Sequence, residues 1–81
     1  MLGRYEEALR CFDAVIRLLP NHAGAWYNKA GIEALLGHKD KALTLLEKAI
    51  KLNPAVKRDA KKSGFFEGMK NDARFRMLVK D

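Results

Sequence analysis

The feature that most constrains this chain is an internal repeat of 34 residues. Sliding residues 2–20 onto residues 36–54 gives seven identities in nineteen aligned positions, where chance gives about one. The identical pairs are Leu2 and Leu36, Gly3 and Gly37, Ala8 and Ala42, Leu9 and Leu43, Ile16 and Ile50, Leu18 and Leu52, and Pro20 and Pro54. Gly and Pro end helices, and Ala, Leu and Ile pack between them. The repeat therefore predicts an all-α fold of antiparallel helical hairpins stacked in a short array.

Length and composition are those of one small folded domain. The chain has 81 residues, 48% of them hydrophobic and 32% charged, and a chain this short buries only about 60% of the surface that its unfolded form exposes. Charged residues interrupt the amino terminus, and no apolar run approaches the roughly 20 residues that span a bilayer, so we expect neither secretion nor membrane insertion. The single cysteine, Cys11, rules out an internal disulfide and favours a reduced, cytoplasmic setting.

The net charge of +6 is concentrated in the carboxy-terminal third. Residues 1–53 carry eight Lys or Arg against six Asp or Glu, whereas residues 54–81 carry eight against four. This excess is compatible with attraction to an acidic peptide or to nucleic acid. Because the cations alternate with acids and form no dense run, we favour the simpler interpretation of solvated helix faces.

The first helix is predicted over residues 4–19. One stripe along it contains Ala8, Phe12, Val15, Ile16 and Leu19. Pro20 ends the helix, because proline lacks an amide donor and disfavours helical geometry in the residue before it. Residues 1–3 are expected to be the last turn of an earlier helix, since the matching Leu36 and Gly37 close the second one.

Two further helices complete the repeat. The second is predicted over residues 22–36 with Asn21 as its cap. The third follows a tight connection at residues 37–40 and ends at Asn53 and Pro54.

The last part of the chain does not follow the repeat of 34 residues. Residues 55–62 begin another helix, and Ser63 and Gly64 break the period. After the break we expect one helical turn with Phe65, Phe66 and Met69, a cap at Asn71 or Asp72, and a final short amphipathic helix with Phe75, Leu78 and Val79. The predicted division is half a repeat at 1–21, a complete repeat at 22–55, the start of a third repeat at 56–64, and a capping tail at 65–81.

The pattern resembles the tetratricopeptide repeat (TPR) over residues 1–62. The residues that fit its frame are Trp26, Ala30, Ala42, Leu46, Ala49 and Pro54 in the second copy, and Gly3, Tyr5, Ala8, Phe12, Val15 and Pro20 in the first. Lys29 and Glu33 depart from it, because the family usually has leucine and an aromatic residue there. The resemblance implies an all-α TPR solenoid with a carboxy-terminal capping helix that acts as a non-catalytic adaptor or scaffold.

The resemblance also implies a concave groove for an extended peptide or a partner's helix. The residues carried onto this groove are Tyr27, Asn28, Gly31, Leu35, Arg58, Lys61 and Lys62. Asn28, Arg58 and Lys62 stand at positions resembling those with which some TPR proteins hold the carboxy-terminal carboxylate of heat-shock chaperones. A protein partner with an acidic carboxy terminus is the corresponding expectation, since residues four apart share a helix face and cations bind carboxylates through charge-assisted hydrogen bonds.

Other classes of function find less support in the sequence. No phosphate loop, carboxylate pair or nucleophile set appears, so we expect no enzyme, and Cys11, His22 and His38 have no metal-like spacing, so we expect no metal or cofactor. We expect Cys11 to be partly buried and His38 to be solvated.

Two alternatives remain open. The aromatic and basic residues Phe65, Phe66, Arg74, Phe75 and Arg76 leave nucleic-acid binding as a less favoured alternative. The apolar stripe of the first helix, Phe12, Val15, Ile16 and Leu19, predicts a homodimer if part of it stays open to solvent.

Overall fold

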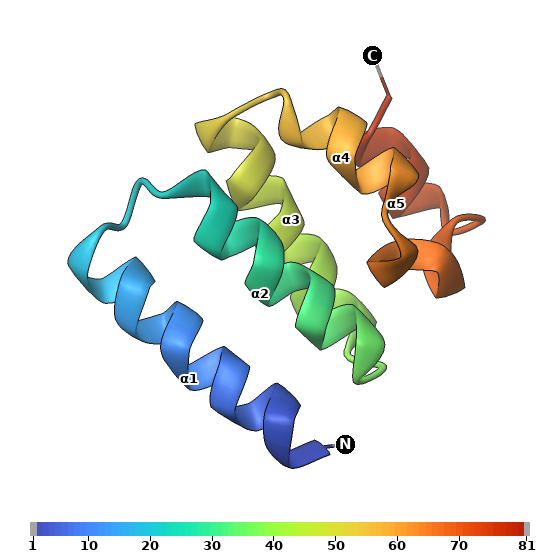
Figure 1. The fold of residues 1–81 in the computed structure, drawn as a ribbon. Helices are drawn as coiled ribbons and strands as arrows, with labels where there is room; N and C mark the ends of the chain where they lie inside the picture. The colour runs from blue at the N-terminus through green and yellow to red at the C-terminus, as the bar shows by residue number, and fades with distance from the viewer. Residues whose placement is uncertain (1, 81) are drawn as a thin grey trace.

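The structure is a computed structural model that describes residues 2–80, an array of helices joined by short turns (Figure 1). The elements in order are α1 (Leu2–Leu18), α2 (Ala23–Leu35), α3 (Lys39–Leu52), α4 (Val56–Lys62), the 3-10 helix η1 (Gly64–Met69) and α5 (Ala73–Leu78). Helices α1, α2 and α3 lie side by side and alternate in direction, and α4, η1 and α5 pack at the end farthest from α1. No strand occurs in the described range. The predicted all-α fold of antiparallel hairpins with a capping helix is confirmed.

Two predicted helix boundaries are wrong. Leu2 and Gly3 belong to α1 rather than to an earlier helix, and Met1 lies outside the described residues. Gly37 has a φ of 83° and reverses the chain after α2, whereas Gly3 has no positive φ and simply continues a helix. Lys39 and Asp40 form the first turn of α3 rather than a connection, because one left-handed glycine is enough for the turn and Asp40 is favourable near a helix amino terminus.

The start of α2 also differs from the prediction, because His22 rather than Asn21 is its cap. His22 has an extended backbone, with φ −81° and ψ 93°, and its Nδ1 accepts a hydrogen bond of 2.9 Å from the amide of Ala25. Asn21 still belongs to the turn that leaves Pro20, so its side chain stands too early to cap α2. Trp26 fixes this turn, since its Nε1 donates to the carbonyl of Pro20 over 2.8 Å.

Small residues let α2 and α3 approach closely. Ala30 of α2 and Ala42 and Ala49 of α3 are fully buried, and Leu43 and Leu46 fill the space beside them. Alternating small and large side chains in this way gives close packing between antiparallel helices.

The capping tail adds its own layer to this core. Phe66 is fully buried and stacks on Phe75 with ring centroids 5.6 Å apart, and Met69 and Val79 are buried beside them. The aromatic side chains of η1 and α5 therefore face the repeat rather than solvent.

Asp72, one of the two predicted caps, anchors α5. One of its oxygens accepts from the amides of Arg74 at 2.9 Å and Phe75 at 3.2 Å, and the other lies 2.7 Å from Nζ of Lys39. The hydrogen bond from Lys39 and those from the two amides hold the pKa of Asp72 below its ordinary value, and Asp72 raises the pKa of Lys39. Because Arg74 also pairs with Asp40 at 3.2 Å, two polar contacts join the starts of α3 and α5.

Candidate functional site

The face of α2 predicted to line a groove lies against η1. The ring of Tyr27 is 6.4 Å from that of Phe65 and 5.9 Å from that of Phe66. Gly31 is buried, and a Cβ built there would lie 2.6 Å from Cγ of Phe65. Only glycine leaves room for this ring, so the half-buried Phe65 becomes part of the same face as Tyr27.

Asn28 lies between Tyr27 and Gly31 in the middle of α2, and Leu35 lies at its carboxyl end. Asn28 is half-buried, and within residues 2–80 its side chain forms no hydrogen bond. Leu35, near the carboxyl end of α2, exposes 44% of its surface. Helix α2 therefore adds a polar amide and an apolar side chain to the aromatic pair of Tyr27 and Phe65.

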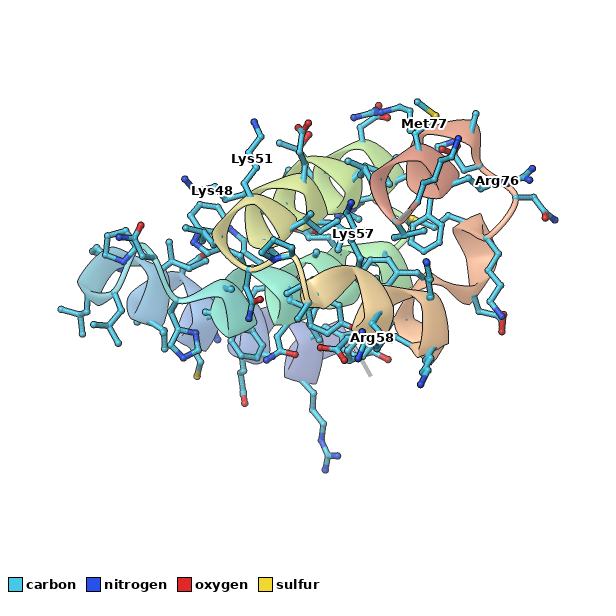
Figure 2. The ribbon with its side chains drawn as sticks, turned by 90° about the horizontal axis from the view of Figure 1, so that it is seen from above. Lys48, Lys51, Lys57, Arg58, Arg76 and Met77 are labelled. Atoms are coloured by element: carbon cyan, nitrogen blue, oxygen red, sulfur yellow. The ribbon has the colours of Figure 1, made fainter. Side chains whose placement is uncertain are left out.

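Helix α4 contributes positive charge. It carries four cations against one acid, Asp59, and the three cations predicted for the groove, Arg58, Lys61 and Lys62, are exposed. In Figure 2, Lys57 points toward α5 and Arg58 toward the opposite edge of α4. The Nζ of Lys57 donates to the carbonyl of Lys80, two residues after the end of α5, over 2.9 Å. Arg58 and Lys62 stand one helical turn apart and share a side of α4.

Sequence reasoning missed a hydrogen bond between a buried acid and an exposed histidine beside the turn between α2 and α3. Glu33 is only 5% exposed, and its carboxylate lies 2.7 Å from Nδ1 of His38, so the imidazole donates to it. The amide of His38 also donates to the carbonyl of Glu33 over 2.9 Å. The side chain of His38 is thus exposed but hydrogen-bonded. The feature of the sequence that could have predicted this contact is an acid at a position that is usually apolar, followed five residues later by a histidine.

The predicted apolar stripe of α1 is only partly covered. Phe12, Val15 and Ile16 are half-buried against α2, whereas Leu19 is 56% and Leu18 is 80% exposed. Cys11 is exposed rather than partly buried as expected, because it lies on α1 outside the stripe that meets α2.

Within the part of the chain that the structure describes, two kinds of feature are missing. No group of three or more His, Cys, Asp or Glu side chains is placed to hold a metal ion. No described helix has the length and apolarity needed to cross a bilayer.

Comparison with known proteins settles what kind of repeat this is. The family model of the tetratricopeptide repeat matches residues 2–57. The chain belongs to the TPR family. No curated protein and no solved structure matches it. TPR repeats generally mediate protein–protein interaction and are typically non-catalytic.

The TPR match ends within α4, at residue 57. The remaining part of α4, η1 and α5 therefore lie outside the matched repeat, although Phe66 and Phe75 belong to the same core.

Proposed function

We propose that this TPR domain is an adaptor that holds an extended peptide or a partner's helix on the face shared by α2, η1 and α4. This groove surface consists of Tyr27, Asn28, Leu35, Phe65, Arg58, Lys61 and Lys62, with Gly31 beneath Phe65. The observation that supports the proposal is the contact of Phe65 with Gly31, which puts a half-buried ring beside that of Tyr27. The next residue of α2, Asn28, has a side-chain amide without a hydrogen-bond partner in residues 2–80. Aromatic rings and cations are enriched where proteins bind other proteins.

The charge of the groove surface selects the kind of peptide. Arg58 and Lys62 are exposed and one turn apart, so they can bind a carboxylate together. Asn28 supplies a further donor from α2. A peptide with an acidic carboxy terminus fits this combination, its apolar side chains lying on Tyr27 and Phe65.

The test is a fluorescence anisotropy screen of labelled peptides that end in an acidic residue, each with a free and an amidated carboxy terminus. We expect peptides that bind only with a free carboxylate, and about tenfold weaker binding to a variant with Asn28→Ala, Arg58→Ala and Lys62→Ala. The control variant, Arg10→Ala with Arg17→Ala, removes two charges from α1. Equal affinity for the triple variant and the parent would contradict the proposal.

A second candidate function is self-association through α1. Leu19 is 56% exposed and continues the half-buried stripe of Phe12, Val15 and Ile16, and the adjacent Leu18 is 80% exposed. In Figure 1, α1 stands at the edge of the array with α2 on one side only. Covering such an apolar strip with a second copy removes it from water.

For this second candidate we expect a concentration-dependent dimer in sedimentation equilibrium at micromolar concentration. A variant with Leu18→Glu and Leu19→Glu should be monomeric, because it places charges in the strip. Met77→Glu is the matched control, since Met77 is 72% exposed on α5 at the other end of the molecule. A parent protein that stays monomeric over the whole concentration range rules the dimer out.

A further inference from the structure

A second surface lies on the carboxy-terminal side of the molecule, beside α5. An open depression of 660 Å³ is lined by Lys61, Lys70, Ala73, Phe75, Arg76, Met77, Val79 and Lys80. Most of these residues belong to α5 and to the turn before it. Only Lys61 is shared with the groove surface, so the depression is a separate feature of the capping tail.

The floor and one rim of this depression are apolar. Phe75 and Val79 are at least 90% buried and show only their edges, whereas Met77 is 72% exposed. Met77 also lines a neighbouring depression of 340 Å³ with Leu43 and Leu78. Figure 2 shows Met77 at the outer side of α5, where its flexible thioether side chain can cover an apolar group.

The rest of the rim is basic, and one of its cations, Lys70, pairs with Glu67. Arg76 and Lys80 are exposed, and their side chains form no ion pair within residues 2–80. Asp72 pairs with Lys39 at 2.7 Å and Asp40 with Arg74 at 3.2 Å, both away from Arg76 and Lys80, whereas Glu67 pairs at 2.7 Å with Lys70 of the rim. Arg76 and Lys80 therefore leave a positive potential beside an apolar floor.

We propose that this depression binds an acidic peptide segment that places one apolar side chain between Met77 and the edges of Phe75 and Val79, with its carboxylates on Arg76 and Lys80. An acidic peptide is the partner that fits this depression, because its charge is opposite to that of Arg76 and Lys80. A second copy packed through the same depression would bring Arg76 and Lys80 of both copies together, and facing like charges disfavour that contact. Single-stranded nucleic acid fits less well, because proteins that bind it offer aromatic faces for stacking, and Phe75, the aromatic residue that lines the depression, is buried.

The probe is a fluorescein-labelled acidic peptide with a single central leucine and an amidated carboxy terminus, titrated by anisotropy with the whole chain. Amidation removes the terminal carboxylate, so binding does not depend on the carboxylate contact proposed for the groove surface. Arg76→Gln with Lys80→Gln should weaken binding about tenfold. Arg58→Gln with Lys62→Gln, which removes the same charge from the groove surface, should leave it within about twofold.

A third variant tests the apolar floor. Met77→Gln should weaken binding of the leucine peptide and leave unchanged the affinity for the same peptide with serine at its centre. Circular dichroism of each variant checks that its helices are intact, and none of the five changed side chains is buried.

Two results would overturn the proposal. Equal weakening by the two double glutamine variants would mean general attraction between opposite charges. A single-stranded oligonucleotide that binds more tightly than the peptide, and loses affinity in the Arg76→Gln, Lys80→Gln variant, would assign the depression to nucleic acid.

Discussion

Replacing Phe66 with alanine should lower the free energy of unfolding by about 3–5 kcal/mol. Phe66 is fully buried, stacks on Phe75 and lies 5.9 Å from the ring of Tyr27, so its removal leaves a cavity where η1, α5 and α2 meet. Urea unfolding followed by circular dichroism measures the change. The control, Met77→Ala on the exposed side of α5, should change the stability by less than about 0.5 kcal/mol.

The Phe66 experiment also defines the extent of the folding unit. Residues 58–81 lie outside the TPR match, yet Phe66, Met69, Phe75 and Val79 belong to the same buried cluster as Leu43 and Leu46. If Phe66→Ala strongly lowers the free energy of unfolding and the protein still unfolds in one cooperative transition, the repeat and the tail unfold together. A loss no greater than that of the Met77 control would show that the tail contributes little to the core.

The second large effect is expected at His38. Replacing His38 with alanine at pH 7 should destabilise the fold by about 1–3 kcal/mol, because the buried carboxylate of Glu33 loses its hydrogen-bond partner. Thermal and urea unfolding both report the change. His38→Gln keeps a side-chain donor and is the milder comparison.

A double variant shows whether the destabilisation comes from the unpaired carboxylate of Glu33 or from the lost packing of the His38 side chain. Glu33→Leu combined with His38→Ala removes both polar partners and puts an apolar side chain in the buried position of Glu33. We expect its stability to be close to that of the parent, since replacing both members of a buried pair is often neutral. A double variant as unstable as His38→Ala alone would mean that the loss does not come from the unpaired carboxylate.

Most of the fold could be predicted because one period of 34 residues repeats both the packing residues and the helix ends. Ala42 and Leu43 repeat Ala8 and Leu9, and this places the buried side of α3 correctly. The prolines mark the ends of α1 and α3 because proline acts locally. Local rules gave the wrong cap for α2, because histidine is not a preferred cap and only the path of the turn brings its Nδ1 to Ala25.

The candidate site was less predictable, because it depends on contacts between residues far apart in the chain. Phe65 stands one period after Gly31, so equivalent positions of neighbouring repeats meet, a glycine on one side and an aromatic ring on the other. The sequence showed the glycine and the aromatic tail without showing that they touch. Glu33 looked like a departure from the family pattern, and its partner in the following turn explains how the chain tolerates a buried carboxylate.

The capping tail makes the two ends of the array unlike, and this limits the symmetry of any assembly. Helix α1 presents exposed leucines at one end, whereas the other end presents Arg76 and Lys80 around α5. A head-to-tail filament would place those leucines against cations, which disfavours open growth. Contact between two copies through α1 would instead be isologous, with the same patch on both partners, and would close at two subunits related by a twofold axis.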